Sequence, residues 1–249
     1  MTSVWSCGGG VQSTAIAALI VSGRLPVPDY AAIVDTNREL SSTWDYMEKV
    51  TAPALLKVGC VLYRVDKRDF ATVDLWGGKD GDSLLIPVFT DANGDVGKLP
   101  GYCSGEWKQR VLQRWLKKNG VKSAEMWMGI STDEINRASF PKGAWTKKYP
   151  LIDLRMNRGD CVALVEKMGW PMPPRSSCWM CPNHTQNEWR EIKENNPSDW
   201  RKAVSFEKMI QKKDPHAWLH ADCKPLEDCD ITDYNESMFT RCASGMCFV

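Results

Sequence analysis

The stretch SVWSCGGGVQSTAIAALI, residues 3–20, decides the fold, because three consecutive glycines join an apolar run to a helical run. Each glycine costs about 0.5–1 kcal/mol relative to alanine, so their presence here indicates that the backbone must come close to something. Residues 3–7 predict a strand, and residues 11–22 predict a helix that ends at Gly23. In an α/β sheet, such a joint lies at the carboxyl edge of the strands, where ligands bind.

The start of this helix is suited to phosphate, because a helix amino terminus presents N–H groups and a partial positive charge. Gly8, Gly9 and Gly10 would let the backbone approach phosphate oxygens, and Ser13 and Thr14 would add hydroxyl donors. The spacing matches neither G-x-x-x-x-G-K-[ST] nor G-x-G-x-x-G. A glycine turn that binds no ligand remains the alternative at this point.

The rest of the chain alternates between strand-like and helix-like segments, which predicts the α/β class. We expect a parallel twisted sheet of about five strands with helices on both faces. A nucleotide-binding α/β domain is predicted at 1–170 and a cysteine-rich C-terminal region at 171–249, with a hairpin at Asn93-Gly94 within 77–101. Further strands are predicted at 30–36, 60–65 and 124–130, and further helices at 41–58, 106–119, 160–168, 188–194 and 198–212.

Composition narrows the class of protein. The chain has 249 residues, 43% of them hydrophobic, and a net charge of +1, so it can bury a full core and its charge demands neither nucleic acid nor a membrane. It has no run of 18 apolar residues, and its start does not resemble a signal sequence, so we expect a cytoplasmic protein with no membrane partner. In that compartment, ten cysteines indicate metal or redox chemistry rather than disulfides.

The loop GGGVQS, residues 8–13, resembles the PP-loop of the ATP pyrophosphatase superfamily, whose usual form is S-G-G-x-D-S. Gly8 stands in place of the first serine, and Gln12 stands in place of the aspartate, which removes one carboxylate from magnesium binding. The resemblance implies the adenine nucleotide alpha hydrolase-like, HUP-type version of the fold. Five later segments resemble, in order, elements of phosphoadenylylsulfate (PAPS) reductase-like proteins and of the DNA-phosphorothioation ATPase: VDTNRE, YCSGEWKQRVLQRWL, MGISTDEINRA, YPLIDLRMNRGDCVALVEKMGWP and SSCWMCP.

The resemblance also implies the residues of a nucleotide site. The ligand would be ATP or an adenylylsulfate-type nucleotide, with Mg²⁺. Lys108 and Arg137 would act in catalysis by neutralising the phosphate charge that develops during reaction. The residues expected to bind the nucleotide are Ser6, Gly8, Gly9, Gly10, Gln12, Ser13, Thr14, Asp35, Thr36, Glu39, Gly129, Asp133 and Glu134.

The pair Cys178-x-x-Cys181 places two thiolates where one metal centre can hold both, in a loop stiffened by prolines. A sulfur-rich site of this kind suits zinc or an iron–sulfur cluster. The resemblance adds Cys103 as a ligand and thereby favours a 4Fe–4S cluster. Cys242 is expected as the fourth ligand, unless that position stays open, and Cys247 as a sulfur relay. We expect the three cysteines to converge near the glycine loop.

The other cysteines and the histidines give secondary expectations. Zinc held structurally by Cys178 and Cys181 is one alternative, and a separate zinc site is another. Cys7, Cys60 and Cys161 lie in strand or helix patterns and are expected to be buried as small apolar side chains. His184 is expected at the surface. The residues of the separate zinc site would be Cys223, Cys229, Cys242 and Cys247.

Three functions remain open. The first is an enzyme that adenylates an acceptor oxygen with ATP and then transfers sulfur to it. The acceptor would be a nucleic acid or a small molecule, and a cysteine desulfurase would donate the sulfur. The second is a reductase of adenylylsulfate or its 3′-phosphate, although the chain lacks the E-C-G-[IL]-H segment of those reductases. The third is a nucleotide-binding iron–sulfur protein without catalysis. A homo-oligomer is an expected partner state in each case.

Overall fold

The described part of the computed structural model, residues 1–79 and 81–231, falls into two units. The first unit contains Met1–Ala71 and Trp107–Ser176. The second contains Thr72–Glu106 and the described residues from Ser177 onward. The predicted domain boundary at residue 170 stays a prediction. Cys242 and Cys247 lie outside the described residues.

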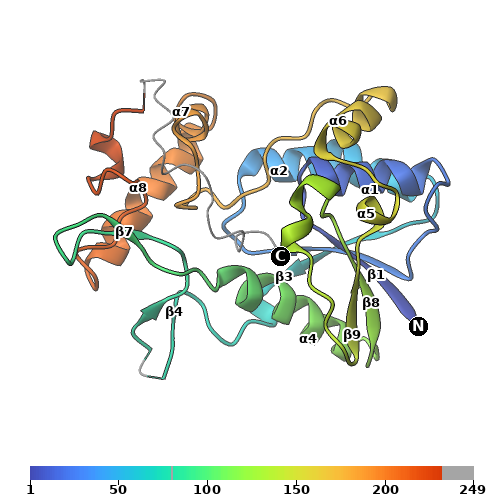
Figure 1. Ribbon diagram of the computed structural model, residues 1–249. Coiled ribbons are helices and arrows are strands. Elements are labelled where there is room, and N and C mark those ends of the chain that lie inside the picture. The colour runs from blue at the N-terminus through green and yellow to red at the C-terminus, as the bar shows by residue number, and fades with distance from the viewer. Residues whose placement is uncertain (80, 232–249) are drawn as a thin grey trace. The chain divides into compact units, whose positions relative to one another are not determined.

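Five parallel strands form the centre of the first unit, which confirms the predicted fold class (Figure 1). Their order in the sheet is β3-β2-β1-β8-β9, and every neighbouring pair is parallel. The strands are β1 (Thr2–Cys7), β2 (Tyr30–Asp35), β3 (Leu62–Asp66), β8 (Ala124–Met128) and β9 (Trp145–Lys148).

Strand β9 was not among the predicted strands. Its sequence, WTKK, has no apolar run, and all four residues are half-buried. It pairs with β8 alone, with Trp127 opposite Lys148, so it is an edge strand of this sheet. Edge strands tolerate lysine, and lysine there also blocks pairing with another chain.

The helices of the first unit begin and end close to the predicted positions. The predicted helix at 41–58 contains a turn of π-helix, Met47–Thr51, directly before Pro53. Proline lacks an N–H group and cannot complete the usual i→i−4 ladder, which explains the local widening. The helices are α1 (Val11–Val21), α2 (Ser41–Tyr46), α3 (Ala52–Leu56), α4 (Arg110–Lys118, after a π-turn at Gly105–Gln109), α5 (Pro150–Asp153) and α6 (Arg158–Lys167).

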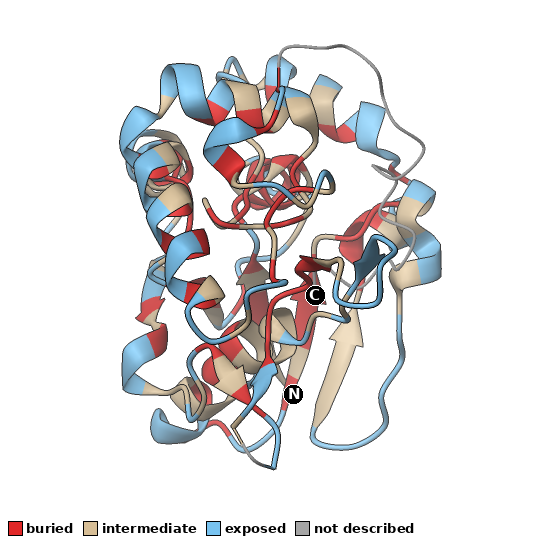
Figure 2. Cartoon of the chain, turned by 90° about the vertical axis from the view of Figure 1, so that its left-hand side faces the viewer, coloured by how far each residue is buried: buried red, intermediate tan, exposed pale blue. Residues whose placement is uncertain are grey.

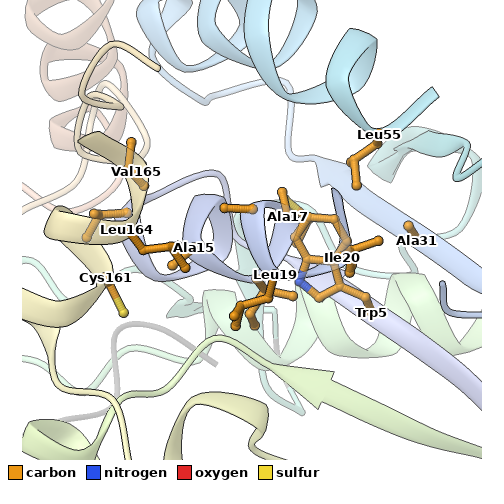
Figure 3. Packing of buried hydrophobic residues seen from close by; sticks show 14 of the residues in the cluster. Trp5, Ala15, Ala17, Leu19, Ile20, Ala31, Leu55, Cys161, Leu164 and Val165 are labelled. Atoms are coloured by element: carbon orange, nitrogen blue, oxygen red, sulfur yellow. The ribbon is translucent and has the colours of Figure 1, made fainter. Parts of the chain in front are cut away.

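Helix α1 lies inside the first unit, because residues 15–19 are completely buried. A helix that is apolar all round must be covered on all sides. Figure 3 shows what covers it: Trp5 and Ala31 from the strands, Leu55 from α3, and a group from α6. The opposite face of the sheet carries a second apolar cluster, in which Val4 and Val34 pack with Leu112 of α4. Helices therefore cover both faces, as predicted, and many show pale blue outer sides and red inner sides in Figure 2.

The second unit has little regular structure. Two short hairpins pair β4 (Trp76–Gly77) with β5 (Ser83–Leu84), and β6 (Phe89–Thr90) with β7 (Gly97–Lys98). The second hairpin turns at the predicted Asn93-Gly94, where Gly94 has φ +86° and its N–H bonds the carbonyl of Asp91 at 3.0 Å. The two predicted helices are present as α7 (Gln186–Asn195) and α8 (Pro197–Gln211). None of the described helices is both long and apolar enough to cross a membrane.

Candidate functional site

The glycine loop lies between β1 and α1, where the sequence predicted it. Gly9 has φ +80°, and a Cβ atom at this position would lie 2.9 Å from Cγ2 of Thr43 and 3.0 Å from Oγ of Ser176. Gly9 is therefore required by conformation and by the protein's own packing. Gly10 is different, because its backbone is extended and a Cβ atom there would have ordinary room, 3.8 Å from Ser176. Packing therefore does not explain Gly10.

Three hydroxyl groups fix the shape of this loop. Oγ of Ser13 accepts a hydrogen bond from the N–H of Gly8 at 2.8 Å, and Oγ of Ser176 donates to the carbonyl of Gly8. Oγ1 of Thr14 is buried and donates to the carbonyl of Gly10 at 3.1 Å. A hydroxyl can accept and donate at once, and the Ser13 hydroxyl also lies within hydrogen-bonding reach of the Cys7 thiol. Within the described residues, no side chain caps the amino terminus of α1.

Gln12 connects the loop to the segment that follows β8. Its Nε2 donates to Oε2 of Glu134 at 2.9 Å and lies 3.5 Å from Oγ of Ser131. Its Oε1 lies 3.4 Å from a guanidinium nitrogen of Arg158, and Glu134 also pairs with Arg137 at 2.7 Å. The neutral amide of Gln12 can therefore donate a hydrogen bond to the carboxylate of Glu134 and accept one from the guanidinium group of Arg158. An aspartate at position 12 would instead face Glu134 with like charge, which gives a physical reason for the departure from the usual PP-loop.

The end of β8 also lies against the loop. A Cβ atom at Gly129 would come within 3.2 Å of Oγ and 3.4 Å of the backbone nitrogen of Ser13, so a larger residue there would push Ser13 by a few tenths of an ångström. Asp133 accepts a hydrogen bond from the N–H of Arg158 at 3.0 Å. Partial burial works to raise the pKa of Asp133, but hydrogen bonds from the Ser131 side chain and from backbone N–H groups leave that pKa below its ordinary value.

The end of β2 carries the predicted Asp35, which is 5% exposed. Its carboxylate accepts hydrogen bonds from the guanidinium group of Arg64, at 2.6 and 3.0 Å, and from the N–H of Asn37 at 2.7 Å. Arg64 also lies over the ring of Trp44, with 3.7 Å between its Cζ and the ring centroid. Asp35 is thus oriented by a side chain from β3.

Glu39 and Lys108 form an ion pair of 2.8 Å, in which the Glu39 side chain is 2% exposed. Two more cations, Arg38 and Lys67, lie 4.9 and 4.5 Å from the ring centroid of buried Trp107. Cations over an aromatic face are stabilised by the ring quadrupole. The region after β2 therefore gathers positive charge around one buried acid, which suits an anionic ligand.

These residues share one edge of the sheet, because β1 has β2 and β8 as its neighbours and all three run parallel. Ser6 lies half-buried on β1, opposite Ala32 and Met128. The predicted loop, the segment after β2 and the segment after β8 are thus brought together at the carboxyl ends of adjacent strands. Their assignment to a nucleotide remains a prediction.

The cysteine turn, residues 178–181, belongs to the second unit. The N–H of Cys181 bonds the carbonyl of Cys178 at 3.0 Å, and the N–H of His184 bonds the carbonyl of Cys181 at 3.2 Å. The expectation of a surface His184 is wrong: this residue is only 7% exposed, and its ring packs 4.6 Å from that of Trp189. Its Nε2 lies 2.9 Å from the carbonyl of Cys178, so the imidazole is buried because it holds the turn.

Cys103 belongs to the same unit as this turn. The N–H groups of Tyr102 and Cys103 both bond the carbonyl of Leu85, at 2.7 and 3.0 Å. Five residues before Cys103, Nζ of Lys98 bonds Oδ1 of Asn183 at 2.5 Å, which ties the β6–β7 hairpin to the segment just after the cysteine turn. The two cysteine-bearing segments are therefore joined within the second unit.

Cys103, Cys178 and Cys181 are all half-buried, unlike the cysteines of the core. Sulfur ligands of this kind suit zinc or an iron–sulfur cluster. The choice between zinc and a cluster remains a prediction.

The three cysteines expected in the core are there: Cys7, Cys60 and Cys161 are all buried. Burial raises the pKa of the Cys7 thiol to about 12, against hydrogen bonds from Gly9 and Ser13 that lower it. Burial likewise raises the pKa of Cys161 to about 12. These thiols stay protonated at neutral pH and are poor ligands and nucleophiles.

Sequence reasoning missed three residues that contact the predicted site residues. They are Ser176, which contacts Gly8, Arg158, which contacts Gln12, and Arg64, which contacts Asp35. Arg64 carried a visible signal, because it is a charged residue in an otherwise apolar strand segment. Ser176 stands directly before the cysteine turn, and its bond to Gly8 spans 168 residues, so nothing local indicated it.

No protein-family model and no curated protein matches the chain. Among solved structures, phosphoadenylyl-sulfate (PAPS) reductase from Candida auris, in its phosphate complex, is 15% identical over 72% of this chain and 82% of that chain, with a TM-score of 0.44. U34-tRNA thiolase NcsA from Methanococcus maripaludis, solved with its 4Fe–4S cluster, is 13% identical over 85% of this chain and 72% of that chain, with a TM-score of 0.46.

Proposed function

We propose that this chain is a PP-loop enzyme that binds ATP or a related adenine nucleotide at the glycine loop, adenylates an acceptor and takes part in sulfur transfer to it. The observation that carries the proposal is Gly10. Its lack of a side chain is not demanded by packing, and it stands at the uncapped amino terminus of an 11-residue helix. A backbone that is open in this place, at the carboxyl edge of a parallel sheet, suits phosphate.

The chemistry of the first step assigns roles to the side chains around the loop. An oxygen atom of the acceptor attacks the α-phosphorus of ATP, a new oxygen–phosphorus bond forms, and pyrophosphate leaves with the electron pair of the broken bond. The Ser13 hydroxyl and the N–H groups of the helix start would hold phosphate oxygens. Lys108, oriented by Glu39, and Arg137, oriented by Glu134, would offset the negative charge that grows in the transition state.

In the second step, a sulfur nucleophile would replace the adenylate at the acceptor carbon, and AMP would leave with the oxygen. Cys103, Cys178 and Cys181 would hold a 4Fe–4S cluster, which supplies an iron site that binds sulfur when the cluster is present. His184 fixes the conformation of the cysteine turn through the carbonyl of Cys178. A nucleic-acid acceptor and a cysteine desulfurase as sulfur donor are the partners that complete this proposal.

Gln12 favours a second candidate, a nucleotide-binding protein without turnover. Its amide is engaged with Glu134 and Arg158, and it supplies no carboxylate for magnesium. Products separate the candidates. Pyrophosphate released from ATP supports the enzyme proposed above, sulfite released from a sulfonucleotide supports a reductase, and binding without either product supports the second candidate.

Titration calorimetry of the Ser13→Ala variant with ATP and with adenylylsulfate tests the nucleotide site. We expect binding to weaken by about 1–3 kcal/mol, because the variant loses a phosphate donor and leaves the N–H of Gly8 without its acceptor. Ser22→Ala is the matched control, since its hydroxyl bonds the carbonyl of Leu19 at the far end of α1. Unchanged affinity of the Ser13 variant for both nucleotides would remove Ser13 from the site.

A further inference from the structure

The segment after α8 brings a histidine, an aspartate and a cysteine to one point in the second unit. One ligand atom each of His220, Asp222 and Cys229 lies within 4.8 Å of the other two. His220 and Cys229 are buried, at 5% and 6% exposure, and Asp222 is exposed. We propose that these three residues bind a zinc ion, at a site separate from the cysteine turn and from the glycine loop.

The imidazole of His220 is already in the form that binds a metal. The N–H of Asp222 donates to Nδ1 of His220 at 3.2 Å, so this nitrogen carries a lone pair and no proton, and a metal ion would displace that N–H when it binds. The same Nδ1 lies 3.5 Å from Oδ1 of Asp222. The lone pair and the carboxylate thus lie side by side, and neutral imidazole nitrogen is a common metal ligand.

The loop that carries His220 and Asp222 is fixed at both ends by one buried acid, and Cys229 follows three residues after its second fixed point, Leu226. The carboxylate of Glu207, on α8, accepts from the N–H of Leu219 at 2.9 Å and from the N–H of Leu226 at 2.6 Å. Both leucines are completely buried. Between them the loop turns tightly, because the N–H of Cys223 bonds the carbonyl of His220 at 3.2 Å. A site held this way needs little ordering when the ion binds.

The donor set points to zinc, which takes imidazole nitrogen, thiolate sulfur and carboxylate oxygen in tetrahedral geometry. Bonds of about 2.0–2.3 Å place tetrahedral ligands roughly 3.3–3.8 Å apart, so atoms that lie within 4.8 Å of one another need to close by at most about 1.5 Å. Water would fill the fourth position, on the exposed side of Asp222. The Cys229 sulfur now lies 3.6 and 3.5 Å from the carbonyls of Lys224 and Pro225. On binding it would lose its proton to solvent, one proton for each ion.

The full-length protein, purified anaerobically and stripped of loosely bound metal, would be titrated with zinc in competition with a chromophoric chelator. The variants are Asp222→Asn, His220→Ala and Cys229→Ser. Controls are His216→Ala, whose ring bonds Asp91 at 2.8 Å outside the group, and Cys60→Ser, in the first unit. Cobalt in place of zinc adds a visible spectrum whose thiolate-to-metal band reports on Cys229.

We expect one zinc ion per chain, and binding weaker by about 100-fold or more in the three ligand variants and unchanged in the controls. Asp222 is exposed, so Asp222→Asn should fold normally. It keeps the test decisive even if a variant of buried His220 or Cys229 does not fold. No zinc binding by the wild type, or equal binding by Asp222→Asn and Cys229→Ser, would overturn the site. Loss of zinc from Cys178→Ser alone would place the ion at the cysteine turn and equally overturn it. Nucleotide affinity, measured in parallel, tests the proposed function independently.

Discussion

The glycine loop of the first unit and the cysteine turn of the second are held in place by different kinds of interaction. The loop sits at the end of β1 between two parallel strands, and the helix behind it is buried completely over residues 15–19. The cysteine turn is part of no strand of the described sheets. It is held by backbone bonds within residues 178–184 and by the buried ring of His184.

This difference indicates where a ligand matters for stability. Burial of apolar surface is the main stabilising contribution in the first unit, so its site should keep its shape without a nucleotide. The second unit also buries apolar side chains, among them Trp189 and Ile210, but polar bonds fix its reactive residues. A metal centre there would add to the stability of the cysteine turn, because binding and folding are coupled in such sites.

The largest expected effect tests this contrast through the metal. In Cys178→Ser, we expect the anaerobically purified protein to lose its iron and its broad visible absorption. Amide hydrogen exchange of residues 177–231 should speed up by several orders of magnitude, and that of the first unit should change little. Cys60→Ser is the control thiol. If iron is lost but exchange in the second unit stays slow, the unit does not depend on the metal, and the contrast fails.

A smaller effect is expected at the glycine loop, in a pair of variants with the same backbone strain. Gly9→Ala and Gly120→Ala both place alanine at positive φ, +80° and +83°, but only at Gly9 does the new methyl meet other atoms, at 2.9 Å. We expect urea unfolding to show a loss of about 1 kcal/mol for Gly120→Ala and about 2–4 kcal/mol for Gly9→Ala. Nucleotide binding should be lost only in Gly9→Ala. Equal losses of unfolding free energy in the two variants would mean that the loop moves to make room for the methyl group.

The smallest effect concerns the buried thiols of the first unit. The pKa values of Cys7 and Cys161 are raised by burial to about 12 from 9.0. Since the folded protein holds these protons more tightly, their contribution to stability is fully present below pH 9 and is lost as pH rises toward 12. Urea unfolding at pH 8 and pH 10 should show a modest decrease at the higher pH. At pH 8, neither thiol should react with iodoacetamide until the protein unfolds. Rapid labelling of either would contradict their burial.

The sequence predicted what depends on strand ends and local pattern, and missed what depends on distant partners. Asp35 and the glycine loop could be placed because parallel strands end at the same edge of a sheet. β9 was missed because an edge strand needs no apolar run. His184 was predicted at the surface because a histidine beside cysteines and prolines gives no sign of the aromatic ring of Trp189 that covers it.

The glycine loop depends on Ser176, a residue that the ribosome adds much later than the loop itself. Its hydroxyl donates to the carbonyl of Gly8, 168 residues earlier in the chain. At translation rates of about 5–20 residues per second, this partner is made roughly 10–30 s after the loop itself. Strand β8, which flanks β1 in the sheet, is also made late. A ribosome-bound chain therefore carries an unfinished loop for most of its synthesis, so nucleotide binding should begin only when the first unit is complete.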